Sequence, residues 1–395
     1  MIDITKHNYL KYFLFGSLYF SEGLELILAT VIIPVYFVEK GIPLQTITFV
    51  SGISAMPWVF KFACGMIIDH FIQSGRKAFI LIGGLIGSTG LFSLALVDPS
   101  TSLILFAFLV FVSHIGVVFI DVSSDAWAIQ SSTTNERGKI NGAMTTGLFT
   151  GMTVGALLFS YTAEVFSYSS AFLTAGLLML MILLFPFFTN ETKIIRRYQK
   201  ITSTLINEFK KKTTLLAATF SPIVSINAGI LMFIIPLYMK TILHLNVDQI
   251  GFITAIFPIN IVIGSLIGGV MTDHWGRKII LYIFIFTTIP LTIALIFANT
   301  WQVLAVIYGF IGFLQGGYFY AAFSAMLMDI TNPKIGATQY SILTSLANFG
   351  EIGAGTLSGF LISMLGFTRV FLYSAWALGP ALLILYFIQI KKHSN

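Results

Sequence analysis

The sequence predicts an all-α membrane protein with twelve transmembrane helices in two pseudo-symmetric bundles of six. Of its 395 residues, 56% are hydrophobic and 10% are charged, whereas soluble domains carry roughly 25% charged residues. Apolar runs of about 20 residues, long enough to cross a bilayer as helices, recur along the whole chain. A fixed spacing between matching residues, described below, divides these runs into two sets of six.

Each expected span is an apolar run bounded by polar residues. The twelve spans are residues 10–38, 44–69, 78–97, 102–130, 140–162, 167–189, 214–240, 248–272, 279–298, 302–328, 338–364 and 368–390. The first run is too long for a signal peptide and leads into further spans, so we expect the N-terminus to be retained. In the fifth span, Gly147, Gly151 and Gly155 recur every fourth residue, which predicts close packing against a neighbouring helix.

The basic residues indicate an orientation, because lysine and arginine concentrate in cytoplasmic loops. With a cytoplasmic N-terminus, eighteen of them fall on the inner side and three, Lys40, Lys240 and Arg369, on the outer side. We therefore expect both termini to be cytoplasmic and the chain to lie in the cytoplasmic (inner) membrane. The net charge of +6 reflects this distribution and indicates no nucleic-acid partner.

A polar, basic connection at residues 190–212 separates the two expected domains, residues 1–189 and 213–395. Related segments follow the second span of each half, GMIIDHFIQSGRK at 65–77 and GVMTDHWGRK at 269–278. Three pairs share an offset of 204 residues: Asp69 and Asp273, Asp125 and Asp329, Gly151 and Gly355. A repeated offset favours a duplicated six-helix unit, as in secondary transporters with parallel repeats.

The segment GVMTDHWGRK resembles the G-x-x-x-D-[RK]-x-G-[RK]-[RK] loop of the major facilitator superfamily, with His274 at a basic position. The first copy departs further, since two extra residues follow Asp69. The resemblance covers the chain and implies transport by rocking of two bundles. Aspartates can cap helices and arginine can pair with acids, so we expect a cytoplasmic gating latch. Its members are Asp69, Arg76, Asp125, Asp273, Arg277 and Asp329; ordinary topology charges are the alternative.

Two further segments are similar to the AmpG-type muropeptide permeases and the acetyl-coenzyme A transporters. They are residues 56–77 and residues 120–130, IDVSSDAWAIQ, and the matching positions are Pro57, Lys61, Asp121, Asp125 and Trp127. The chain departs from that group at Glu25, where the group has proline, and at Glu22, where it has a small or amide residue. The resemblance implies a sugar-peptide or nucleotide-like substrate.

Ionisable side chains inside apolar spans usually face a partner or a water-filled cavity. At ~1.5 Å per residue, Glu22, Asp121 and Lys61 lie at comparable depths of roughly 18, 14 and 13 Å from the cytoplasmic helix ends. Glu22 and Glu25 share a helix face, so both should not ionise together. We expect proton coupling by four residues, Glu22, Glu25, Asp121 and His114. A static buried ion pair beside a satisfied core histidine is the alternative.

The expected substrate contacts combine Lys61 with polar residues in spans of the second half, Asn227, Gln315, Tyr318 and Glu351. Single amides also hold helices together, which is the alternative for Asn227 and Gln315.

The sequence has no HExxH, GxSxG, P-loop or CxxC pattern, so we expect no enzyme, no cofactor and no metal. The favoured function is a monomeric secondary transporter that moves a small polar solute, together with protons, across the lipid bilayer as a symporter. Proton-coupled efflux or uniport is the alternative within transport. A non-transporting receptor or a lipid-scrambling protein on the same fold is the alternative from another class.

Overall fold

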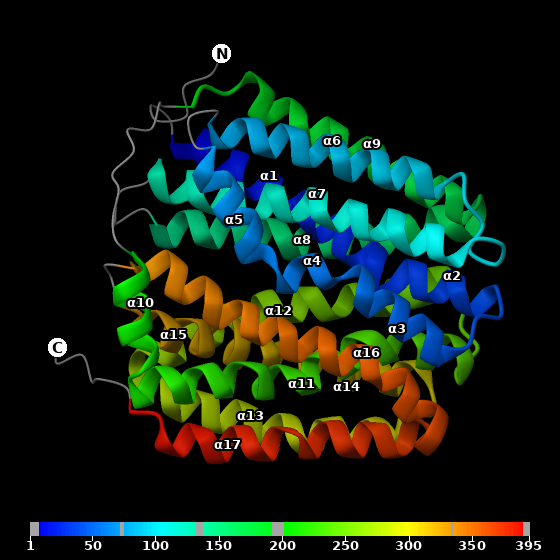
Figure 1. The fold of residues 1–395 in the computed structure, drawn as a ribbon. Helices are drawn as coiled ribbons and strands as arrows, with labels where there is room; N and C mark the ends of the chain where they lie inside the picture. The colour runs from blue at the N-terminus through cyan, green and yellow to red at the C-terminus, as the bar shows by residue number, and fades with distance from the viewer. Residues whose placement is uncertain (1–7, 72–74, 132–136, 192–200, 333–334, 390–395) are drawn as a thin grey trace. The chain divides into compact units, whose positions relative to one another are not determined.

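The computed structural model describes residues 8–71, 75–131, 137–191, 201–332 and 335–389 (Figure 1). Within these ranges the chain is helical, and ten helices are long and apolar enough to cross a membrane. Three of the expected spans account for the difference from twelve: the second is broken, and the eleventh and twelfth are counted as one. The predicted all-α transmembrane fold is confirmed.

The chain divides into two compact units. Unit 1 comprises Met1–Arg196 and Met239–Pro258, and unit 2 comprises Arg197–Tyr238 and Ile259–Asn395. Unit 1 contains α1 (Asn8–Ile27), α2 (Ile33–Glu39), α3 (Leu44–Ser54), α4 (Met56–Val59), α5 (Lys61–His70), α6 (Arg76–Leu94), α7 (Leu103–Gln130), α8 (Arg137–Val165) and α9 (Tyr168–Phe188). Figure 1 shows α6 and α7 side by side in this unit, and α1 packs against both α7 and α8.

Two long helices contribute to both units, α11 (Lys212–Thr241) and α12 (Val247–Trp275). The remaining helices belong to unit 2: α10 (Ile201–Phe209), α13 (Arg277–Ala294), α14 (Trp301–Gln315), α15 (Ser324–Ile330), α16 (Gly336–Trp376) and α17 (Leu378–Phe387). Buried apolar side chains from α11 and α13 to α17, and from the segment Gly316–Phe323, form one core cluster here, and Phe220, Leu281, Tyr318 and Leu343 are among its members.

The second expected span is broken into α3, α4 and α5, because Ala55 and Phe60 interrupt the helical hydrogen bonding. Pro57 lies in the first turn of α4, where a helix tolerates its missing N–H. In the interior of one continuous helix the same residue would remove a backbone hydrogen bond. The eleventh and twelfth expected spans are not separated by a loop, because α16 continues from one into the other through a kink at Gly366. Gly366 has a φ of 77°, a left-handed value that favours glycine, and it divides α16 into two helical parts.

The glycines of the fifth span pack closely against the first helix, as the sequence predicts. A Cβ atom at Gly147 would collide with the backbone of Gly16, and one at Gly151 would collide with the backbone of Phe20. The absence of side chains at these positions therefore lets α8 approach α1 at backbone distance. This approach fixes the position of the α1 residues that carry the site.

Both π-helical segments interrupt helices that carry candidate residues. Leu28–Ile32 separates α1 from α2, and Gly316–Phe323, which includes Tyr318, separates α14 from α15. A π segment adds a residue to the turn and rotates the side chains that follow it.

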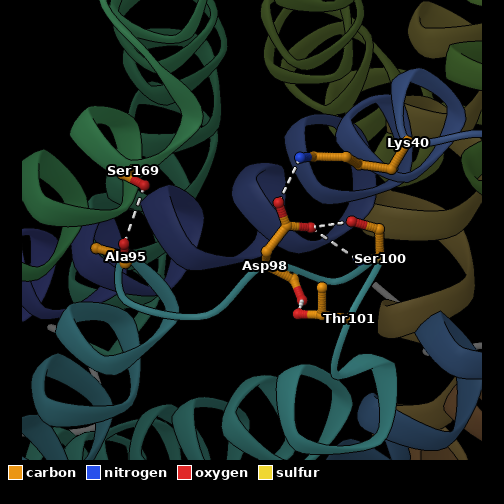
Figure 2. A network of polar contacts seen from close by, with 6 residues as sticks. All are labelled: Lys40, Ala95, Asp98, Ser100, Thr101 and Ser169. Atoms are coloured by element: carbon orange, nitrogen blue, oxygen red, sulfur yellow. Dashed lines mark hydrogen bonds and ion pairs between the residues drawn. The ribbon is translucent and has the colours of Figure 1, made fainter.

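A polar network fixes the loop between α6 and α7 (Figure 2). Lys40 donates to Asp98 at 2.5 Å, and the backbone N–H of Ser100 donates to the other oxygen of that carboxylate at 2.8 Å. Hydrogen bonds from Lys40 first, then from the hydroxyl and the backbone N–H of Ser100, lower the pKa of Asp98 to about 2. Ser169 donates to the carbonyl of Ala95 at 3.0 Å, which ties α9 to the end of α6.

The polar connection between the halves contains a helix, α10, whose end is fixed to unit 2. Glu208 accepts a hydrogen bond from Asn332 at 2.7 Å and another from Lys211 at 2.8 Å. The first of these hydrogen bonds holds the end of α10 to Asn332, which follows α15 in unit 2.

Candidate functional site

An acidic cluster lies among three helices of unit 1. Its members are Tyr19 and Glu22 on α1, Lys61 at the start of α5, and Asp121 and Asp125 on α7. Nζ of Lys61 is 3.5 Å from Oδ2 of Asp121. The hydroxyl of Tyr19 lies 2.5 Å from Oδ1 of Asp125 and 3.1 Å from Oδ1 of Asp121.

Helix geometry brings these side chains together. Asp121 and Asp125 are four residues apart on α7, and Tyr19 and Glu22 are three apart on α1, so each pair shares a helix face. Lys61 begins α5 immediately after the break at Phe60. The break therefore places the ammonium group where α5 meets α7, beside Asp121.

The charges of the acidic cluster do not balance. Glu22 lies within electrostatic range of Lys61, Asp121 and Asp125, and its buried Oε2 atom has no hydrogen-bond partner in the described ranges of the chain. Three ionised carboxylates and one ammonium group carry three negative charges and one positive, a net −2. A net charge of this size inside a bilayer is costly, so the uptake of protons is the direct way to neutralise it.

Glu25 and His114 form a second buried pair in unit 1. Nδ1 of His114 is 3.5 Å from Oε1 of Glu25 and 3.0 Å from the carbonyl of Val110, and both side chains are almost fully buried. We expected His114 to extend a proton path along α7 from Asp121. The structure instead pairs it with Glu25 on α1, so Glu22 and Glu25 have different partners although they share a helix face.

The candidate substrate residues of unit 2 fall into two groups. Asn227 is fully buried, and its amide nitrogen donates to the carbonyl of Ser374 at 3.2 Å and to the hydroxyl of Thr292 at 3.3 Å. These contacts tie α11 to α13 and α16, which favours the helix-packing alternative for Asn227. Gln315 and Tyr318 differ, because Nε2 of the amide and the phenol oxygen are buried and have no hydrogen-bond partner among the residues that the structure describes.

Glu351 on α16 lies within electrostatic range of Tyr318. Its side chain is half-buried in the middle of a long apolar helix. Among the candidate substrate residues of unit 2, the Gln315 amide and the Tyr318 phenol therefore keep a polar atom without a partner in the described part of the chain, and Glu351 adds one acid.

The expected latch residues of the second half are in contact. Nε of Arg277 donates to Asp329 at 3.0 Å, and another guanidinium nitrogen lies 3.3 Å from Asp273. In the first half, Arg76 donates to the carbonyl of Ala126 at 2.6 Å and to Oε1 of Gln130 at 2.5 Å.

The first-half residues depart from the expected latch in two ways. Asp125 belongs to the acidic cluster, where it accepts from Tyr19. Glu191 caps α6, since its carboxylate accepts from the backbone N–H groups of Arg76 at 2.8 Å and Lys77 at 2.9 Å. The side chain of Asp69 lies outside the described residues.

Sequence reasoning missed Tyr19, although a signal was present. Tyr19 precedes Glu22 by three residues, which places both on one face of α1. A tyrosine in an apolar span is usually a packing residue, and the bonds of Tyr19 to α7 depend on helix rotation.

The sequence model of one protein family, the Major Facilitator Superfamily, matches residues 15–222 and 217–395. The chain belongs to the Major Facilitator Superfamily. The family and the fold establish a multi-pass membrane transporter of small molecules rather than an enzyme. This superfamily member is similar to the anhydromuropeptide permease of Escherichia coli K12, with 22% identity over 381 residues, covering 93% of this chain and 77% of the relative.

Two other proteins resemble this superfamily member along its length. An uncharacterised protein of Haemophilus influenzae is 24% identical over 408 residues, covering 95% of this chain and 94% of the relative. The crystal structure of a variant of the nucleoside transporter NupG superimposes with a TM-score of 0.80 at 16% identity, covering 96% of this chain and 99% of NupG. At this identity the structural likeness supports the fold.

Proposed function

We propose that this transporter is a proton-coupled symporter of a small polar solute. The acidic cluster carries the proposal, because two buried carboxylates and the half-buried Asp125 surround one ammonium group and one phenol. Proton uptake by Glu22 and Asp121 neutralises the cluster, and release restores its charge. The buried pair of Glu25 and His114 is a further place where a proton can reside.

The proposed transport cycle follows from the repeat. Residues 1–189 and 213–395 move as two bundles in the cytoplasmic membrane, with both termini in the cytoplasm, as the basic residues favour. Arg277, Asp273 and Asp329 form the proposed cytoplasmic latch in the second half, and their ion pairs support it. Lys61 contributes substrate contacts from the first bundle.

The second bundle contributes Gln315, Tyr318 and Glu351 to the proposed substrate site. Buried donors without partners are expensive, and a ligand that supplies acceptors removes this cost. The similarity to the anhydromuropeptide permease makes a sugar-peptide the first substrate to test. Such a solute carries hydroxyl, amide and carboxylate oxygens, which suit these donors and Lys61.

The test is uptake of a radiolabelled anhydromuropeptide into proteoliposomes with an imposed pH gradient, alongside a peptide, a disaccharide and a coenzyme A ester. Glu22→Gln and Asp121→Asn are expected to abolish gradient-driven accumulation while counterflow, which needs no net proton movement, continues. Asp248→Asn is the matched control, because it removes an exposed carboxylate in the first turn of α12. Undiminished proton dependence in both cluster variants would contradict the coupling role.

The alternatives give different results in the same assay. Efflux by proton exchange reverses the direction of the gradient effect, and uniport abolishes that effect while equilibration remains. Labelled phospholipid that changes leaflets, with no solute uptake, would indicate a lipid-scrambling protein.

A further inference from the structure

The hydroxyl of Tyr19 lies between two carboxylates of the acidic cluster. Its oxygen is 2.5 Å from Oδ1 of Asp125 and 3.1 Å from Oδ1 of Asp121. A phenol has one hydrogen to donate and lone pairs that accept. With two carboxylates in reach, the hydrogen of Tyr19 is donated to one aspartate, and its oxygen can accept from the other when that aspartate is protonated.

We propose that Tyr19 is a proton-transfer residue that passes a proton between Asp125 and Asp121, and this rests on the proton coupling proposed above. When Asp125 is protonated, its O–H donates to the Tyr19 oxygen, and the Tyr19 hydrogen is donated to Asp121. The O–H bond of Asp125 breaks as one forms on Tyr19. The original Tyr19 O–H bond breaks as one forms on Asp121. Tyr19 is neutral before and after, and the negative charge moves from Asp121 to Asp125.

The surroundings of Tyr19 stabilise both ends of this transfer. Asp121 and Asp125 are separated by four residues, about 6 Å along the axis of α7. Lys61 lies beside Oδ2 of Asp121 and stabilises a negative charge there. The hydrogen bond from Tyr19 stabilises a negative charge on Asp125. Each aspartate therefore has its own partner for the ionised state, and the phenol connects the two.

Few other ionisable groups face this connection. Glu22 on the same helix lies in electrostatic range of Tyr19, and Cys64 on α5 lies in range of Asp121. Three helices of unit 1 contain no Asp, Glu, Lys, Arg or His in the stretches 78–94 of α6, 140–163 of α8 and 168–188 of α9. The proton on the two aspartates thus depends on Tyr19, Glu22 and Lys61 among the described groups.

The first test needs no substrate. Infrared difference spectra of the full-length protein in lipid are recorded against pH, and the carbonyl band of protonated carboxyl groups is assigned with Asp121→Asn and Asp125→Asn. Tyr19→Phe removes a hydrogen bond to a charged group, so the midpoint of this band moves up by about one to two pH units. Tyr161→Phe, at an exposed position on α8, is the matched control and leaves the midpoint unchanged.

The second test measures the transfer itself. Gradient-driven accumulation of the labelled anhydromuropeptide falls about tenfold or more in Tyr19→Phe while counterflow is retained, because a positioned proton-transfer group typically contributes 10²-fold or more. A Tyr19→Phe variant with the wild-type midpoint and wild-type accumulation overturns the role of Tyr19 and leaves the coupling proposal standing. A wild-type protein with no carboxyl band that responds to Asp121→Asn or Asp125→Asn overturns both.

Discussion

Replacing Asn227 by leucine separates a helix-packing role from a substrate contact. The amide nitrogen has two hydrogens, and its acceptors within 3.3 Å are the carbonyl of Ser374 and the hydroxyl of Thr292. An interhelical hydrogen bond in a membrane protein contributes about 0.6 kcal/mol, so two contribute about 1.2 kcal/mol. Leucine also removes the buried Oδ1 atom, which has no partner, and this offsets part of the loss.

The expected net change in Asn227→Leu is a loss of about 1 kcal/mol in the free energy of unfolding. For a unit of this size that corresponds to a decrease of roughly 2–4 °C in Tm. Thermal unfolding of the purified protein in detergent measures it, and transport is then assayed per folded molecule. We expect the KM of the folded variant to equal that of the wild type, because the helix contacts occupy the amide.

Thr219→Val is the matched control on the same helix. The Thr219 hydroxyl is exposed and donates to the carbonyl of Leu215, one turn earlier on α11, at 3.0 Å. Its loss breaks no contact between helices, so Tm should stay within about 1 °C of the wild-type value. An Asn227→Leu protein with unchanged Tm and a tenfold higher KM would refute the packing assignment and restore Asn227 to the substrate site.

Two further predictions concern stability. Gly151→Ala should lower Tm, because a Cβ atom there collides with the backbone of Phe20. Gly142→Ala on the same helix is the control: its Cβ atom meets open space, so this variant should raise Tm slightly. Equal changes in Tm in the two variants would contradict the close contact between α8 and α1. Hydrogen bonds from Lys211 and Asn332 lower the pKa of Glu208, so Glu208 stabilises the fold above the unfolded-state pKa of about 4.3 and loses this effect as the pH falls. Glu208→Gln should therefore lower Tm at pH 7, and its difference from the wild type should shrink as the pH falls through the folded-state pKa of Glu208, as thermal unfolding across pH will show.

Hydropathy predicts where the chain crosses the bilayer, because apolar length is a property of the sequence alone. The interruption of the second span is a matter of backbone hydrogen bonds, and Pro57 was its available signal. The join at Gly366 depends on one left-handed residue, which average hydropathy over a window does not detect.

Depth along a helix is predictable from residue counting, which places Glu22, Lys61 and Asp121 at comparable depths in the membrane. Rotation about the helix axis is not predictable in this way. It decides that Asp125 faces Tyr19 and that His114 faces Glu25. These contacts join separate helices, so their geometry depends on tertiary packing, which includes the glycine contacts between α1 and α8.

The helix break at Phe60 also places the N-terminus of α5, and not only the Lys61 side chain, near the acidic cluster. The first N–H groups of a helix have no partners within that helix, and they give its beginning a partial positive charge. The first turn of α5 carries both Lys61 and Cys64, which lie near Asp121. The backbone therefore adds to the positive potential at the acids. A substitution of Pro57 that allowed a continuous helix would weaken this potential, and the proton affinity of the cluster would change with every charged side chain still in place.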